Sequence, residues 1–195
     1  MIKQCIENQK KHQTYSPDDV ILLVDEIKNF KFTDVQKKEE LIQSGKAHYS
    51  TMLSKESLPT PMQMAVFNQS LETYKDKIAY GVMYLSSNIQ SKLASLKKEE
   101  VVLISLIRAG LPLGVSIQRF LKSEGVKSTH YGVSIIRDKG IDEVAMKAIM
   151  EAHPKAFIAF IDGWVGKGAI TRQLSESCAK LGISRYFYAL SDPTR

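Results

Sequence analysis

Residues 157–172 read FIAFIDGWVGKGAITR. Five apolar residues lead to Asp162, and three glycines, a tryptophan, a valine and a lysine then fill positions 163–168. An apolar run of this length predicts a buried strand, and the residues from Ala169 to Gly182 have the spacing of an amphipathic helix. The stretch therefore predicts a strand, a glycine-rich turn and a helix, with a carboxylate at the end of the strand.

Three further apolar runs predict strands with helical segments between them. The strands are VVLISLI (101–107), THYGVSII (129–136) and SRYFYAL (184–190), and the helices are VSIQRFLKSEG (115–125) and IDEVAMKAIMEAH (141–153). Alternation of this kind is typical of an α/β protein with an open, mainly parallel sheet. Ligands of such sheets bind beyond the carboxyl ends of the strands. The turns RAGLPLG, RDKGID and DGWVGKGA follow those ends, so we expect a site there.

The first half of the chain has a helical pattern. We expect one helix in YSPDDVILLVDEI (15–27), with Ser16 as its cap and Val20, Leu23, Val24 and Ile27 on one face. A second is expected in FTDVQKKEELIQSG (32–45), capped by Thr33 or Asp34, and a long one from Pro61 to about Leu96, which Gly81 could interrupt. We therefore predict a helical N-terminal extension or lid over residues 1–97 and an α/β core over residues 98–195.

The composition narrows the classes of partner. The 195 residues carry a net charge of +6, with a sequence pI of about 9.2, but both signs are mixed along the chain. This favours a solvated surface and an anionic small molecule over nucleic acid. Cys5 and Cys178 are the two cysteines, which favours a reducing compartment. The N-terminus has no signal-peptide pattern and no run is long enough to cross a membrane, so we expect a cytoplasmic protein.

The turn after Asp162 has the residues of a phosphate-binding loop. The first N–H groups of a helix point at an anion, glycines let the backbone approach it, and Lys167 adds a positive charge. Asp162 can accept hydrogen bonds from sugar hydroxyls or hold a cation through water. The spacing fits neither G-x-x-x-x-G-K-[ST] nor G-x-G-x-x-G, so the two common nucleotide motifs are excluded. The alternative is a turn in which the glycines serve packing alone.

These segments resemble type I phosphoribosyltransferases. FIAFIDGWVGKGAITR is similar to their ribose-phosphate motif, LISLIRAGLPLG to their pyrophosphate loop, and YGVSIIRDKGID lies where they carry a flap. Together with YSPDDV and HYSTMLSKESLPTP, these segments resemble the phosphoribosyltransferases associated with tellurium-resistance and stress gene clusters, some of which are labelled StiP and carry the name cysteine protease. The resemblance covers about Tyr15 to Leu190.

The resemblance implies phosphoribosyl pyrophosphate as substrate, Mg²⁺ as cofactor, and transfer of the phosphoribosyl group to an unknown acceptor. Asp162 and Arg108 would be catalytic. The pyrophosphate loop would be Arg108, Ala109 and Gly110, and the flap Arg137, Asp138 and Lys139. The ribose 5-phosphate loop would be Asp162, Gly163, Trp164, Val165, Gly166, Lys167, Gly168 and Ala169. No direct metal ligand is implied, because Mg²⁺ would arrive with the substrate and reach Asp162 through water. A homodimer is a further expectation.

The sequence departs from the family pattern in three places. Many members have two adjacent acids, whereas Gly163 follows Asp162 here. Lys167 and Ile170 stand where threonines are common, and Thr171 comes one position later. The resemblance also implies a further strand beyond Arg195, so a truncated C-terminus is one interpretation. The single acid keeps a second hypothesis open, a regulatory module that binds phosphoribosyl pyrophosphate or a nucleotide without turnover.

A cysteine protease is the third hypothesis. It requires a thiol beside a histidine. Cys178 falls on the apolar face of an expected helix, and Cys5 lies in an N-terminal segment that we expect to be mobile. The histidines at 12, 48, 130 and 153 are scattered, and none is expected to act as a general base.

Overall fold

The computed structural model describes residues 1–10, 15–25, 27 and 29–192. The chain forms two compact units, which are considered separately. The larger one consists of Met1–Asp25 and Asp76–Arg195, and the smaller one of Glu26–Lys75.

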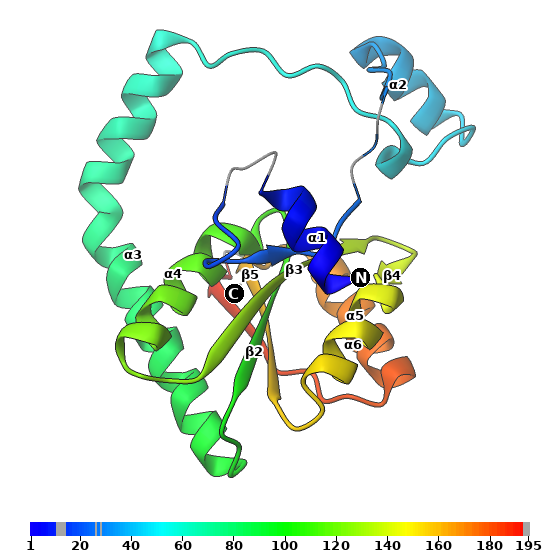
Figure 1. The fold of residues 1–195 in the computed structure, drawn as a ribbon. Coiled ribbons are helices and arrows are strands. Elements are labelled where there is room, and N and C mark those ends of the chain that lie inside the picture. Colours follow the sequence, from blue (N-terminus) through cyan, green and yellow to red (C-terminus); the bar gives the residue numbers. More distant parts are fainter. Residues whose placement is uncertain (11–14, 26, 28, 193–195) are drawn as a thin grey trace. The chain divides into compact units, whose positions relative to one another are not determined.

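The larger unit is built on a twisted sheet of parallel strands (Figure 1). Its order is β1-β3-β2-β5-β6, and the short β4 pairs with β3 in the antiparallel sense. The strands are β1 (Ile21–Leu22), β2 (Val101–Ile107), β3 (Ser128–Ile136), β4 (Gly140–Ile141), β5 (Phe157–Trp164) and β6 (Phe187–Ser191). The predicted fold class, an open and mainly parallel α/β sheet, is confirmed.

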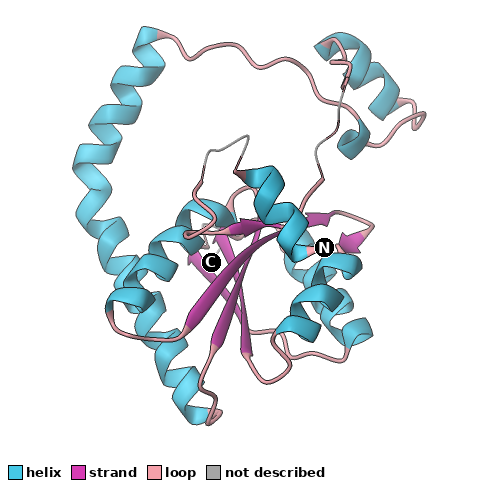
Figure 2. Ribbon diagram, in the orientation of Figure 1, coloured by secondary structure: helices cyan, strands magenta, loops and turns pink. Residues whose placement is uncertain are grey.

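Helices cover both faces of this sheet (Figure 2). The helices α1 (Ile2–Gln9), α5 (Glu143–Ala152) and α6 (Ala169–Leu181) pack on one face. The other face is covered by α4 (Gly110–Ser123) and the second half of α3 (Pro61–Ser95). Alternate residues of a strand point to opposite faces, and those of β2 enter different cores: Val102 and Ile104 on one side, Val101 and Leu103 on the other. Burial on both faces explains why this strand is a continuous apolar run.

The helix expected over residues 15–27 is wrong. Ser16 does cap a single turn, because its carbonyl accepts from the backbone N–H groups of Asp19 and Val20. The chain then extends as β1, where Leu22 N–H donates to Gln9 Oε1 at 2.9 Å and Leu23 N–H donates to the Gly132 carbonyl. Partners that are distant in the sequence therefore replace the local bonds of a helix.

The N-terminal segment that was expected to be mobile forms α1 and packs against the sheet. The side chain of Gln9 is buried and donates to the carbonyls of Tyr15 and Val20, in addition to accepting from Leu22. Cys5 lies in the same core as β3 and α6. A single buried amide therefore fastens the N-terminal helix to the edge strand of the sheet.

Helix α3 runs without interruption through Gly81. A Cβ atom at this position would lie 2.5 Å from Leu190 Cδ1 of β6. The glycine therefore gives room for the edge strand to pack on the helix. The boundary predicted at residue 97 differs from the division observed, since residues 1–25 and the second half of α3 belong to the same unit as the sheet.

The smaller unit contains α2 (Val35–Gln43) and the 3-10 turn η1 (Tyr49–Thr51). The predicted cap of α2 is confirmed as Asp34, whose carboxylate accepts from the N–H groups of Gln36 and Lys37. Gly45, the predicted stop, has φ +69°, a conformation that glycine adopts without cost.

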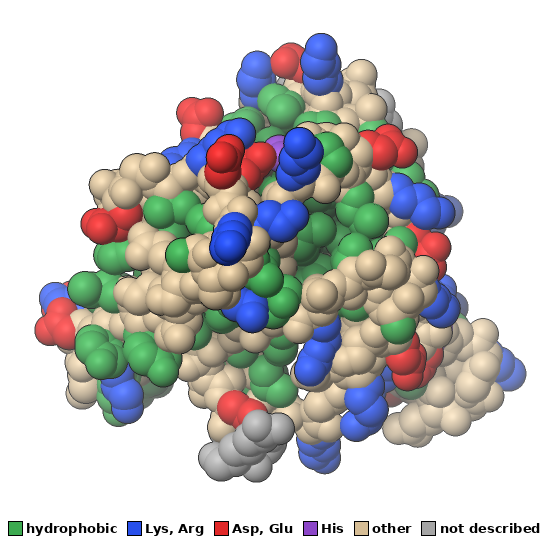
Figure 3. All heavy atoms as spheres, turned by 90° about the horizontal axis from the view of Figure 1, so that it is seen from below, with side chains coloured by type: hydrophobic (Ala, Val, Ile, Leu, Met, Phe, Trp, Pro, Cys, Tyr) green, Lys and Arg blue, Asp and Glu red, His purple; other side chains and the backbone are tan. Residues whose placement is uncertain are grey.

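The surface shows mixed charge. On the face drawn in Figure 3, Lys and Arg side chains lie among Asp, Glu and apolar side chains. No helix within the described ranges combines the length and the apolar character that a membrane crossing requires.

Candidate functional site

A cleft of about 580 Å³ lies at the carboxyl ends of β2 and β5, where the sheet topology placed it. Its walls come from the segments after β2 and β5, from the end of β3 and from the first turn of α6. The lining residues are Leu106, Ile107, Arg108, Ala109, Ile135, Arg137, Asp162, Trp164, Val165, Gly166, Lys167, Gly168, Ala169, Ile170, Thr171 and Phe187.

The segments that follow β2 and β5 touch through their backbones. A Cβ atom on Gly163 would lie 2.7 Å from the carbonyl oxygen of Ala109. A Cβ atom on Gly110 would overlap the carbonyl oxygen of Ile161. Neither position has room for a side chain, so these two glycines allow the predicted pyrophosphate loop and the predicted ribose-phosphate loop to lie side by side.

The predicted turn RAGLPLG is largely helical, because α4 already begins at Gly110. Pro112 is tolerated there since the first turn of a helix has N–H groups without intrahelical partners. Ala109 is the N-cap, and Arg108 precedes it at the wall of the cleft. The predicted pyrophosphate loop is therefore a helix N-terminus, an element whose dipole and first N–H groups favour an anion.

Asp162 is half-buried at the wall of the cleft, and its strand continues to Trp164 rather than ending at the acid. Burial raises the pKa of its carboxyl group, and a hydrogen bond from its neighbour Gly163 N–H to Oδ1, 2.8 Å long, works in the opposite direction. That bond involves one carboxylate oxygen, so the other remains available to accept from a ligand.

The residues from Val165 to Gly168 connect β5 to α6. Gly168 is the N-cap of α6 and has φ +79°, a left-handed conformation that favours glycine. Lys167 is exposed, and Trp164 exposes 58% of its surface beside the cleft. The N-terminus of α6, a cation and an aromatic ring therefore share this wall.

The segment predicted as a flap is the tip of a β-hairpin. β3 and β4 pair through Ile136 and Gly140, and Asp138 at the tip has φ +66°. Arg137 lines the cleft, whereas Asp138 and Lys139 do not. The strand β4 was not predicted, because two residues are too few to give a periodic signal.

Most of the predicted site residues come together in the cleft. Gly110 and Gly163 lie behind its wall and shape it through their backbone contacts. Ile170 and Thr171, which the family pattern had already drawn attention to, also line the cleft. The sequence did not predict an apolar part of the wall, which Leu106, Ile107, Ile135 and Phe187 supply. Their signal was only their position next to the predicted turns.

The cleft offers little direct coordination to a metal. Asp162 is the only acidic residue among those that line it, and in the described part of the chain no group of three or more His, Cys, Asp or Glu could hold an ion. Mg²⁺ is commonly bound through one or two carboxylates together with substrate phosphates. The donor set therefore fits an ion that arrives with a phosphorylated ligand.

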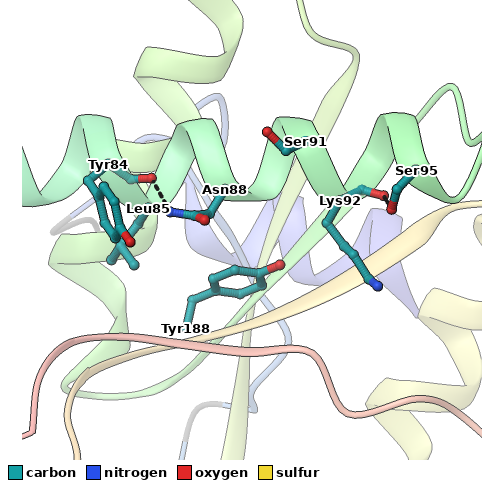
Figure 4. Close-up of a pocket in the computed structure, with 7 residues that line it drawn as sticks. All are labelled: Tyr84, Leu85, Asn88, Ser91, Lys92, Ser95 and Tyr188. Atoms are coloured by element: carbon teal, nitrogen blue, oxygen red, sulfur yellow. Dashed lines mark hydrogen bonds between the residues drawn. The ribbon is translucent and has the colours of Figure 1, made fainter.

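A second cleft, of about 520 Å³, lies between α3 and β6 (Figure 4). Asn88 donates to the Tyr84 carbonyl and Ser95 to the Lys92 carbonyl, so these polar groups are satisfied within their own helix. Lys92 Nζ lies 4.8 Å from the ring centroid of Tyr186. None of the predicted site residues lines this cleft.

Neither cysteine thiol lies at the cleft beyond β2 and β5. Cys5 and Cys178 lie in the core that includes α1 and α6, and neither lines the cleft. Burial raises the pKa of both, to about 11 for Cys178. A thiol is nucleophilic as the thiolate, so these environments suppress reactivity.

His130 and His153 have structural surroundings, and the ring of His48 lies against that of its neighbour Tyr49, with 4.4 Å between the centroids. His153 lies within 2.9 Å of both the Tyr131 hydroxyl and the Glu100 carboxylate, and His130 is buried beside Ser105. His12 lies outside the described residues.

Comparison with solved structures finds distant phosphoribosyltransferases. The hypoxanthine-guanine phosphoribosyltransferase of Schistosoma mansoni in complex with IMP is 13% identical, covers 58% of this chain and 52% of its own, and has a TM-score of 0.39. The Helicobacter pylori xanthine-guanine-hypoxanthine phosphoribosyltransferase is 17% identical, covers 59% and 71%, and has a TM-score of 0.36. Scores this low carry no weight for function.

Comparison with protein families is decisive. Residues 13–195 match the family described as "Tellurite-like stress resistance cysteine protease StiP". The curated "Cysteine protease StiP" of Acinetobacter baylyi (strain ATCC 33305 / BD413 / ADP1) is 42% identical over 145 residues, which are 74% of this chain. The match spans 37% of that relative's length. The chain therefore belongs to the StiP family.

Proposed function

We propose that the cleft binds phosphoribosyl pyrophosphate and that the chain transfers its phosphoribosyl group to an acceptor. The observation that carries this proposal is the convergence of three features in one cleft: two helix N-termini, a single half-buried carboxylate, and the cations of Arg108, Arg137 and Lys167. This arrangement suits a ligand with anionic groups at both ends and hydroxyl groups between them.

Each feature has a role in this scheme. The N-terminus of α4, with Arg108, holds the diphosphate, and Gly166–Ala169 at the N-terminus of α6 hold the 5′-phosphate. Asp162 accepts from the ribose hydroxyls. Trp164 forms a wall beside the sugar, and Arg137 at the hairpin tip neutralises the diphosphate when it departs. The remaining flap residues, Asp138 and Lys139, close over it and exclude water.

The reaction breaks the bond between C1′ of ribose and the diphosphate oxygen. That oxygen keeps the bonding electrons, and a nitrogen or hydroxyl oxygen of the acceptor forms the new bond to C1′ and loses its proton. The sugar becomes cationic as the bond breaks, so catalysis consists mainly of positioning and charge stabilisation. Mg²⁺ that arrives with the diphosphate would supply further charge neutralisation, and Asp162 is the carboxylate in the cleft that could hold it through water.

The first test is titration calorimetry of the chain with phosphoribosyl pyrophosphate and Mg²⁺. We expect micromolar binding that requires Mg²⁺ and weakens about tenfold or more in Asp162→Asn, since a charge-assisted hydrogen bond contributes roughly 1.5–3 kcal/mol. Asp76→Asn is the matched control, because it removes the same charge from an exposed position on α3. Absence of binding by the unmodified chain, or equal binding by both variants, would contradict the proposal.

A regulatory module that binds this ligand without turnover is the second candidate. It is favoured by the scarcity of acid–base groups in the cleft. No histidine lies among the residues that line it, and Asp162 is the one carboxylate there. Release of pyrophosphate in the presence of candidate acceptors distinguishes the two functions, since a module that only binds releases none.

The family description names a cysteine protease, and that activity is the third candidate. Within the described residues, the buried surroundings of Cys5 and Cys178 argue against either thiol as the nucleophile. The geometry of this chain therefore favours the sugar-phosphate proposal.

A further inference from the structure

A chain of buried polar groups lies directly beneath the first turn of α4. Ser105 Oγ donates to the Gly110 carbonyl at 2.9 Å and lies 2.7 Å from His130 Nε2. The other ring nitrogen of His130 lies 2.8 Å from the carbonyl oxygen of Asp19. Ser105 and His130 expose 0% and 2% of their surfaces, so water does not substitute for these contacts.

Helix α4 packs closely on these buried polar groups. A Cβ atom on Gly114, one turn into α4, would overlap both Ser105 Oγ and the His130 ring. The helix therefore rests on the two side chains, and the position of its N-terminus depends on them.

The end of this row of polar groups that lies at Asp19 is held by an ion pair. Arg119 of α4 donates to both carboxylate oxygens of Asp19, from Nε at 2.8 Å and from Nη2 at 2.6 Å. Lys122 Nζ donates to the Asp18 carbonyl at 2.5 Å. The segment before β1 is thereby clamped to α4, and its Asp19 carbonyl is presented to His130.

The three contacts compete for the proton of the Ser105 hydroxyl and the proton of the neutral His130 ring. If Ser105 gives its one proton to the Gly110 carbonyl, it must accept from Nε2–H of His130. A neutral ring then has no proton on Nδ1 for the Asp19 carbonyl. If the ring donates from Nδ1 instead, Ser105 donates to Nε2 and the Gly110 carbonyl loses its donor. The tautomer of His130 thus links the Asp19 segment to Gly110.

We propose that Ser105 and His130 are positioning residues, which hold the N-terminus of α4 in its anion-binding position and couple it to the segment around Asp19. Their effect on affinity rests on the proposed function, because the diphosphate is the ligand assigned to this helix N-terminus. Their effect on the conformation of the free chain does not.

The test compares Ser105→Ala with Ser86→Ala. Ser86 is equally buried, with 0% exposed, and its hydroxyl also donates to a backbone carbonyl, that of Val82 at 2.7 Å. The two changes are chemically identical and differ in location. Two measurements are made on each variant: amide exchange of Leu111, whose N–H donates to the Arg108 carbonyl, and the affinity for phosphoribosyl pyrophosphate with Mg²⁺.

We expect Ser105→Ala to speed exchange at Leu111 at least tenfold relative to amides of β5, and to weaken binding at least tenfold. Ser86→Ala should change neither. Equal exchange at Leu111 in the two serine variants would overturn the positioning role. If the unmodified chain binds no phosphoribosyl pyrophosphate, the proposed function fails, while exchange at Leu111 still decides the positioning role.

If Ser105→Ala unfolds, a second pair of variants tests the contact between Ser105 and His130 without changing Ser105. His130→Gln keeps a polar group near the place of Nε2, facing Ser105, whereas His130→Asn keeps one near Nδ1, facing Asp19. We expect His130→Gln to retain slow exchange at Leu111 and His130→Asn to lose it. The reverse order, or no difference between the two, would overturn the role assigned to the Ser105 contact.

Discussion

His130 lies beneath α4 with 2% of its surface exposed, and burial lowers its pKa to about 4 from an ordinary value of 6.5. The charged groups that act on the ring are Asp19, which favours the imidazolium, and Lys122, which opposes it. Burial outweighs both, so the folded chain holds this side chain neutral at physiological pH.

The neutral ring makes stability depend on pH. Between about pH 6.5 and pH 4 the unfolded chain binds a proton at this position and the folded chain does not. The free energy of unfolding should therefore fall as the pH falls through this range, by about 2 kcal/mol between pH 7 and pH 5 for this group alone. Urea unfolding at the two pH values measures the change.

His130→Gln is the control for that measurement, because glutamine does not titrate. The difference between the two proteins isolates the histidine from the carboxylates that titrate in the same range. A parallel loss of stability in both proteins would show that His130 is not the source.

Single residues also show the limit of prediction from sequence. Asp162, Lys167 and Arg108 could be placed at the cleft because they follow apolar runs and the carboxyl ends of parallel strands converge. The backbone contacts of Gly110 and Gly163 could not be foreseen, since each depends on a carbonyl group from another strand.

At the scale of elements, a glycine of positive φ stands directly before α6 and another directly after it. Gly168 at its start has φ +79° and Gly182 at its end has φ +66°. A Cβ atom on Gly168 would lie 3.6 Å from the nearest side-chain atom, and one on Gly182 would meet nothing within 4 Å. The cost of alanine at either position is therefore the backbone conformation and not a clash.

This symmetry gives a matched pair of substitutions. Gly168→Ala and Gly182→Ala should each lower the free energy of unfolding by about 1 kcal/mol. Only Gly168→Ala should also weaken binding of phosphoribosyl pyrophosphate, because it alters the N–H groups that the proposed function assigns to the 5′-phosphate. Chemical denaturation and calorimetry on both variants check this, and equal effects on binding would contradict the proposed role of the loop.

Elements with strong local signals were predicted well. Helix α6 has an apolar face and a glycine stop, and β2 is a continuous apolar run. By contrast, β1 was predicted as a helix, because its residues have helical spacing and only Gln9 and β3 draw them into a strand. Long-range contacts decide such segments, and a local pattern does not contain them.

At the scale of the whole molecule, burial is very uneven. Six of the seven residues of β2 are buried, whereas α2 of the smaller unit has no buried residue. Local stability follows burial of apolar surface and protection of backbone hydrogen bonds.

Hydrogen exchange measured by mass spectrometry should therefore distinguish β2 of the larger unit from α2 of the smaller unit. We expect amides of Val101–Ile107 to exchange at least on the order of a hundredfold more slowly than those of Val35–Gln43. Similar rates in the two segments would indicate that the smaller unit is held by contacts that its own residues do not provide.

The glycine contacts between the segments after β2 and β5 have a further consequence. Gly110 abuts the carbonyl of Ile161, and Gly163 abuts that of Ala109, so main-chain contacts limit the distance between the two helix N-termini. The distance between the two helix N-termini therefore limits the length of a ligand that can contact both of them. Under the proposed function, the backbone therefore limits the span between the two anionic ends of the ligand, whereas substitutions elsewhere in the cleft change how tightly the ligand is held.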